Sequence, residues 1–160
     1  MITELRTLAD VRKLEQTLAS DFLRVRPTPV LKQAIKDLEK LHQGYFESDV
    51  GPGGNRWEAL RPATIARKGH ADILEDTLAM RNAVTQTSAA GAVRDVFDEG
   101  FNAGLAFGLD DAEIPYWKYH DQGEGRMYRP FIGIVDAELT VIAERLLDHK
   151  LQGMVDANNN

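Results

Sequence analysis

The chain has 160 residues, enough to bury one hydrophobic core without disulfides or metals. It contains no cysteine, which excludes disulfides, thiolate metal ligands and a cysteine nucleophile. Its net charge of −6 opposes a general nucleic-acid-binding surface, which is normally basic. No apolar run approaches the roughly 20 residues of a membrane span. We therefore expect neither a membrane nor a specific nucleic acid as a partner.

Two helices are predicted in the N-terminal third. Residues 8–22 carry apolar side chains at the three- and four-residue spacing of an amphipathic helix. RPTP (26–29) interrupts that pattern, and there Thr28 suits the N-cap and Pro29 the first position of a second helix. The apolar pattern then continues to residue 46. We expect the two helices of residues 8–46 to pair in antiparallel fashion.

A glycine-rich loop over residues 48–56 and two short helices are expected next. Pro62 to Lys68 reads as a helix that ends on Gly69 in a left-handed conformation. EDTLAMRNA (75–83) predicts one or two helical turns capped by Asp76 or Thr77.

Alternating patterns then predict strands, and the clearest is AGLAFGL, which sets large apolar residues on one face and small residues on the other. The four candidate strands are VTQTS (84–88), VRDVF (93–97), AGLAFGL (103–109) and FIGI (131–134). The second and third form a predicted hairpin over about 92–109. A helix with an apolar stripe (Val135, Leu139, Ile142, Leu146 and Leu147) follows, with Asp136 near its start.

The order of elements predicts an α+β fold, since strands and helices do not alternate as βαβ units. We expect an antiparallel sheet of about three to four strands packed against the N-terminal helix pair and the C-terminal helix. Residues 1–157 form one domain in this interpretation, with the α+β region at 57–150 and a disordered tail at 158–160.

Enzymatic motifs are weak throughout. In GPGGNRW (51–57) the glycines are not followed by the lysine and hydroxyl of a phosphate-binding loop. The serines lack a Gly-x-Ser-x-Gly elbow. His70, Asp72, Glu75 and His120 show no metal-ligand spacing. We predict no enzyme and no catalytic, cofactor or metal residues; the alternative is a small metal-dependent hydrolase or nuclease that uses those four side chains.

Aromatic residues crowd into IPYWKYHDQGEGRMYRPF (114–131). Tyrosine, tryptophan and arginine are enriched at the anchors of protein interfaces. The same rings could instead cover the sheet, and the sequence leaves both interpretations open.

Four ordered motifs resemble the phage virion morphogenesis family, the tail-completion or neck proteins of tailed bacteriophages and prophages. The family's W-x-x-L-x-x-x-T-x-x-x-K is matched at Trp57, Leu60, Thr64 and Lys68. Its I-L-x-D-T-G-x-L-R is similar to ILEDTLAMR, which keeps Asp76, Thr77 and Arg81 but has Leu78 for glycine. Its Y-A-x-x-H-Q-x-G is matched at Tyr116, His120 and Gly123, and its P-x-R-P-F-L-G at Arg129, Pro130 and Phe131.

The resemblance, which covers about residues 46–150, implies a structural role without a reaction or cofactor. It implies docking to tail-tube and head-tail connector proteins as a homo-oligomeric ring, in a virion assembled within the bacterial host cytoplasm. The motif residues either contact partners directly or pack internally, as Trp57, His120 and Phe131 would if they only positioned the loops. We expect Trp57 to be at least half buried and the glycines of 51–54 to be exposed.

Overall fold

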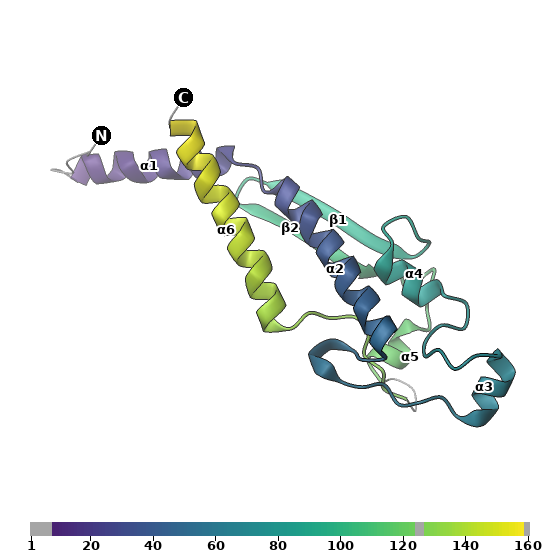
Figure 1. The fold of residues 1–160 in the computed structure, drawn as a ribbon. Helices are drawn as coiled ribbons and strands as arrows, with labels where there is room; N and C mark the ends of the chain where they lie inside the picture. The colour runs from purple at the N-terminus through teal and green to yellow at the C-terminus, as the bar shows by residue number, and fades with distance from the viewer. Residues whose placement is uncertain (1–7, 124–126, 159–160) are drawn as a thin grey trace.

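The structure, a computed structural model, describes residues 8–123 and 127–158, and Figure 1 shows how its elements are arranged. The elements are α1 (Leu8–Arg24), α2 (Thr28–Ser48), a single 3₁₀ turn (Pro52–Gly54), α3 (Pro62–Lys68), α4 (Ala79–Thr85), β1 (Ala92–Glu99), β2 (Asn102–Leu109), α5 (Trp117–Asp121) and α6 (Asp136–Asn158). The predicted α+β class is confirmed.

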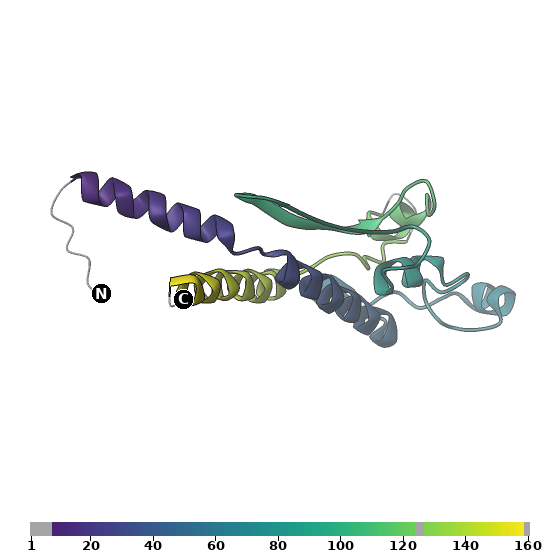
Figure 2. The same ribbon diagram turned by 90° about the horizontal axis from the view of Figure 1, so that it is seen from above.

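Helix α2 is the centre of the fold. It packs against α4, both strands and α6, and Figure 2 shows α2 and α6 on the same side of the hairpin. Phe46 near its C-terminal end enters the main core, whose buried members are Tyr45, Phe46, Trp57, Ile73, Leu74, Met80, Ala83, Val84, Ile114 and Phe131. The core therefore lies at the end of the molecule that also holds α3, α4 and α5.

The predicted antiparallel pairing of the first two helices is wrong. Helix α1 extends away from α2 and contacts α6 instead (Figures 1 and 2). Its C-terminal end is attached through Lys150, whose ammonium donates to the Phe22 carbonyl at 3.0 Å and also to the Val25 carbonyl. Most side chains of residues 12–20 are exposed, so α1 projects as an arm.

The hairpin is confirmed, with β1 and β2 antiparallel and Ala92 opposite Leu109. Arg94, Phe107 and their neighbours form the face toward the helices: the Arg94 guanidinium lies 3.8 Å from the Phe107 ring centre and donates to the Ala83 carbonyl. On the opposite face the Phe97 ring covers Gly104, where an added Cβ would lie 2.6 Å from it. A glycine there lets the ring of the neighbouring strand lie flat on the sheet.

Two strands, not three or four, make up the sheet in the described residues. VTQTS is not a strand, because Val84 is fully buried within α4 and Thr85 ends that helix. FIGI is not a strand either. The N–H groups of Phe131 and Ile132 both donate to the Asp121 carboxylate at 2.9 Å, so side chains satisfy the donors that a strand partner would need.

Two helix caps also differ from prediction. Pro27 occupies the N-cap of α2, and the Thr28 hydroxyl donates to Asp98 at 3.1 Å. Leu78, in a left-handed conformation, precedes α4, and neither Asp76 nor Thr77 occupies the N-cap. The α3 prediction is confirmed, since Gly69 follows Lys68 with φ 81°.

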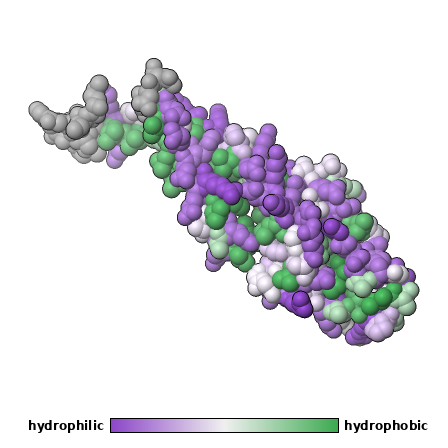
Figure 3. All heavy atoms as spheres, viewed as in Figure 1, coloured by the Kyte–Doolittle hydropathy of each residue, from purple (hydrophilic) through white to green (hydrophobic). Residues whose placement is uncertain are grey.

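Helix α6 carries much exposed apolar surface. Its predicted stripe is only partly covered, because Leu139 and Leu147 are more than half exposed. Figure 3 shows the apolar residues as separate areas among polar ones on the viewed face. Asn158 ends α6 instead of belonging to a disordered tail, and residues 159–160 lie outside the described part. Within that part, no helix has the length and apolar character to cross a bilayer.

Candidate functional site

Motif residues from all four sequence segments meet around one hollow of about 440 Å³. We call it the motif hollow, and its lining residues are Leu60, Thr64, Arg67, Lys68, Leu74, Asp76, Thr77, Met80, Tyr116, His120, Met127 and Arg129. Eight of the thirteen residues that the sequence singled out are among them. The volume falls within the range of ordinary ligand pockets.

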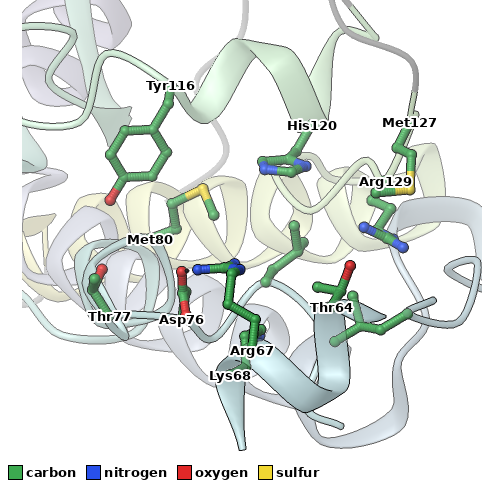
Figure 4. Close-up of a pocket in the computed structure, with 12 residues that line it drawn as sticks. Thr64, Arg67, Lys68, Asp76, Thr77, Met80, Tyr116, His120, Met127 and Arg129 are labelled. Atoms are coloured by element: carbon green, nitrogen blue, oxygen red, sulfur yellow. Dashed lines mark hydrogen bonds and ion pairs between the residues drawn. The ribbon is translucent and has the colours of Figure 1, made fainter. Parts of the chain in front are cut away.

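Short elements and loops build the walls of the motif hollow (Figure 4). Helix α3 supplies Thr64, Arg67 and Lys68, whereas the loop before α4 supplies Asp76 and Thr77. Pro62 fixes the start of α3 and Gly69 its end, so this helix places its side chains at one wall. Loops carrying residues on a packed base are the usual arrangement of binding sites.

Trp57, Pro130 and Phe131 do not line the hollow but support it. The Trp57 indole N–H donates to the Pro130 carbonyl at 2.8 Å, and its ring packs edge-on against Phe46 with centroids 5.3 Å apart. Phe46 also contacts Phe131 in the same manner. These three motif residues therefore act internally and position the loops above them.

Close packing requires glycine at position 51 of the glycine-rich loop. A Cβ at this position would lie 2.0 Å from the Pro130 carbonyl oxygen, so only glycine fits beside the Trp57 contact. The expectation of a buried Trp57 is confirmed, with 4% of it exposed. The expectation of exposed glycines holds for Gly53 and Gly54 and is wrong for Gly51, which is buried.

Arg129 joins two loops at the hollow. Its Nε and Nη2 donate to the Glu58 carbonyl at 3.0 and 2.6 Å, and its backbone N–H donates to the His120 carbonyl at 2.8 Å. The residue is only 1% exposed, and burial lowers the pKa of its guanidinium. Arginine nevertheless remains charged at neutral pH because its ordinary pKa is so high.

His120 lies beside Arg129 in the hollow. Burial, followed by the positive charge of Arg129, lowers the pKa of the imidazole below its ordinary value. Its Nδ1 is buried without a hydrogen-bond partner in the described residues. The ring is therefore neutral at physiological pH, and its motif neighbour Tyr116 is partly exposed at the same wall.

The rim of the hollow carries both signs of charge. Arg67 reaches Asp76 at 3.4 Å, and the Lys68 ammonium donates to the Asp72 carbonyl at 2.7 Å. Among the described lining residues, the cationic side chains of Arg67, Lys68 and Arg129 outnumber the carboxylates, of which Asp76 is the one present. A positive local balance in a protein of net charge −6 favours an anionic group as the occupant.

Arg81 and Gly123 lie outside the motif hollow. Arg81 Nη1 donates to both carboxylate oxygens of Glu75 at 3.0 Å, a charged pair that secures the loop before α4. Gly123 adopts φ 70° next to the Tyr128 ring. Both residues are therefore conformational supports in this structure.

The side chains considered for a hydrolase are spread over separate interactions. His70 Nδ1 lies 3.1 Å from the Asp72 carboxylate, Glu75 pairs with Arg81, and His120 is in the hollow. Across residues 8–123 and 127–158, no group of three or more His, Asp or Glu side chains is placed to hold a metal ion.

The aromatic residues of 114–131 fall into two groups, one buried in the core and one exposed to a possible partner. Phe131 is fully buried and Trp117 packs against the core, whereas Tyr116, Tyr119 and Tyr128 are exposed. Tyr119 and Tyr128 are more than half exposed, which leaves their rings available to a partner.

Sequence reasoning missed four lining residues: Arg67, Leu74, Met80 and Met127. Arg67 immediately precedes the motif lysine, and Met127 stands where the resembling motif P-x-R-P-F-L-G has its first proline. Leu74 was matched only as the leucine of ILEDTLAMR in the family motif, and no spacing rule singles out Met80, which follows the turn at Leu78.

Comparison with known proteins gave no match: no family model, no curated protein and no solved structure corresponds to the chain.

Proposed function

We propose that this protein is a structural component of a tailed bacteriophage or prophage. In this proposal it acts in virion morphogenesis, completing the tail or joining it to the head, and it catalyses no reaction. The observation that carries the proposal is the convergence of four motif segments, spread over residues 57–133, on one hollow and its supporting core.

The distribution of the motif residues supports docking by this end of the molecule. Trp57, Phe131 and Gly51 hold the loops from below, and Thr64, Lys68 and His120 present side chains above. A rigid support beneath exposed loops reduces the ordering cost of binding a partner. We infer that the motif hollow docks onto a tail-tube or head-tail connector protein.

The other end of the molecule supports contacts between copies. Along α6 the exposed large apolar residues are Leu139, Val141, Leu147, Leu151 and Val155. Such surface is unfavourable in water and is commonly covered in an assembly. Repeated head-to-tail contacts of one kind close into a ring when the rotation between copies allows it. We propose that the protein forms such a ring in the virion.

Deletion of the gene from an inducible prophage that carries it tests the proposal. Electron microscopy of the lysate should show filled heads and tails that fail to join, or tails of abnormal length, and the wild-type gene supplied in trans should restore infectious particles. Mass spectrometry of purified particles should find the protein at the tail or neck. Normal infectious particles from the deletion strain would rule the role out.

A matched pair of variants then tests the docking surface. Lys68→Ala removes a rim cation of the motif hollow, and Lys32→Ala removes an exposed cation of α2. With both proteins folded and expressed equally, complementation should fall with Lys68→Ala and remain with Lys32→Ala. Equal complementation by the two variants would show that the rim cation of the motif hollow is not needed for assembly.

A further inference from the structure

Arg129 is a buried cation that contacts no carboxylate directly within residues 8–123 and 127–158. Its side chain donates through Nε and Nη2 to one acceptor, the backbone carbonyl of Glu58, and Nη1 has no hydrogen-bond partner in the described residues. The carboxylates of Glu58 and Asp49 act on it only at longer range. An ion that is largely removed from water costs several kcal/mol unless an opposite charge and further hydrogen bonds compensate it.

The Arg129 side chain lines the motif hollow. Figure 4 shows it directed into the space between Thr64, His120 and Met127. A guanidinium has five N–H donors in a planar fork, and two of its three nitrogens are engaged by Glu58. Nη1 is therefore the nitrogen whose donors Glu58 leaves free for an acceptor in the hollow.

The remaining lining combines apolar surface with two further cations. Leu60, Leu74 and Met80 supply hydrocarbon surface, and Lys68 and Arg67 stand at the rim. Asp76 is the one carboxylate in the part of the lining that the structure describes, and Arg67 already contacts it. His120 adds a ring without charge at neutral pH, since burial lowers its pKa. A hydrated anion without an apolar group would contact the cations but would leave this apolar surface uncovered.

We propose that the motif hollow binds a carboxylate that stands next to an apolar side chain on a protein partner. Arg129 receives the carboxylate through Nη1, Lys68 supports it from the rim, and Leu60, Leu74 and Met80 cover the apolar side chain. A hydrogen bond from a guanidinium to a carboxylate is charge-assisted and about twice as strong as one between neutral groups. This inference deepens the proposed function. It rests on that function in one respect, namely that the partner is a protein.

Small probes test the chemistry on the full chain by two-dimensional amide NMR. N-acetyl-leucine offers the carboxylate at a chain end, and an N-acetylated, C-amidated leucyl-aspartate dipeptide offers it on a side chain. N-acetyl-leucinamide is the neutral match, N-acetylglycine lacks the apolar group, and inorganic phosphate is an anion without one. Ligands of this size bind with dissociation constants on the order of millimolar.

We expect saturable shifts at residues lining the motif hollow with at least one of the two leucine-containing acids. N-acetyl-leucinamide and N-acetylglycine should bind about tenfold more weakly than that acid, since each lacks one of the two recognised groups. Whichever acid binds more tightly identifies the source of the carboxylate. The proposal is overturned if neither acid gives saturable shifts there, if the amide equals the acid, or if phosphate binds there more tightly than both.

A variant on the rim adds a second test that leaves the Arg129–Glu58 contact in place. Met127→Glu places a carboxylate of the chain itself beside the guanidinium, and Leu147→Glu places the same charge on the exposed face of α6. Met127→Glu should weaken binding of the acid probe about tenfold, and Leu147→Glu should change it by less than about twofold. Equal binding by both variants contradicts the proposal, and the wild-type comparison of acid with amide decides the matter should Met127→Glu not fold.

The role in assembly and the carboxylate preference can be tested separately. If acid probes bind as expected but a prophage carrying Met127→Glu still assembles infectious particles, docking through the hollow in assembly is wrong and the carboxylate preference stands. If acid and amide bind equally while the deletion phenotype is as expected, the role in assembly stands and the ligand chemistry is wrong.

Discussion

Leu78 stands where the phage virion morphogenesis family, which the sequence resembles, has glycine. Its backbone conformation indicates how much strain leucine causes at this position. Its φ of 61° and ψ of −1° are left-handed, a conformation that costs an L-residue with a Cβ roughly 1–2 kcal/mol. Its carbonyl accepts the first hydrogen bond of α4 from Asn82 at 2.8 Å, so the residue cannot relax without disturbing that helix. We predict that glycine is tolerated better than alanine at this position.

The comparison of Leu78→Gly with Leu78→Ala isolates the backbone contribution. Both variants lose the leucine side chain, so its lost contacts cancel in the difference. Glycine normally destabilises a folded chain by about 0.5–1 kcal/mol relative to alanine because its unfolded state has more freedom. Subtracting that cost from the left-handed strain leaves Leu78→Gly more stable than Leu78→Ala by about 1 kcal/mol.

Urea unfolding followed by tryptophan fluorescence measures this difference as a higher midpoint at an unchanged slope. In thermal unfolding it corresponds to about 2–4 °C for a chain of this size. The control is Ala59→Gly, at an exposed loop residue that is not among the positive-φ positions, where glycine should lower stability. If Leu78→Gly is no more stable than Leu78→Ala, the left-handed turn before α4 is wrong.

Three further predictions concern the core. Trp57→Phe leaves the buried Pro130 carbonyl without its donor and should lower the free energy of unfolding by about 1–3 kcal/mol in urea titration, with Trp57→Ala costing about 3–5; an unchanged Trp57→Phe would contradict the indole contact. Gly51→Ala forces a Cβ against the Pro130 oxygen and should cost at least about 1–3 kcal/mol in the same assay, so wild-type stability would disprove the close packing. Burial raises the pKa of Tyr45 from 10.0 to about 12, so the unfolded chain loses this proton first and stability falls as pH rises from 10 through 12, whereas below pH 10 it does not depend on this group's titration. Because its hydroxyl has no partner in the described residues, Tyr45→Phe should match or exceed wild-type stability at neutral pH and lose less of it at high pH, as measured by unfolding at each pH; a marked loss at neutral pH would reveal a missing partner.

The parts of the fold that could be predicted from sequence are those fixed by local chemistry. Alternation over 103–109 identified β2, because every second residue faces the helices. Pro62 and Gly69 fixed α3, since each restricts or permits a particular backbone conformation. These signals act within a few residues and need no information about the rest of the chain.

The failed predictions depend on contacts between distant residues. VTQTS alternates, yet Val84 is drawn into the core as part of α4. FIGI has strand-like composition, but Asp121 takes up two of its N–H groups. Nothing near Arg24 in sequence signals that α1 projects beside α6, because that arrangement depends on Lys150.

The site followed the same division. Thr64 and Lys68 are separated by about one turn of α3, so they lie on the same face of that helix. Their place on one wall of the motif hollow could therefore be predicted. The convergence with His120 and Arg129 could be expected only from the resemblance, since no spacing rule relates residues so far apart. Met80 and Met127 carry no chemical signature, and only their position reveals their part in the site.

Arg129 links the stability of the fold to the occupancy of the hollow. Its guanidinium holds the Glu58 carbonyl on one side and faces the hollow on the other, so removing it would disturb the loop and the ligand at once. A group that binds only the folded protein also stabilises it, in proportion to the logarithm of its concentration over the dissociation constant. A carboxylate at Nη1 should therefore raise the unfolding temperature as it fills the hollow. In the proposed complex it would supply the counter-charge that Arg129 lacks among the described residues, so the loops of the hollow should be most rigid when the carboxylate is bound.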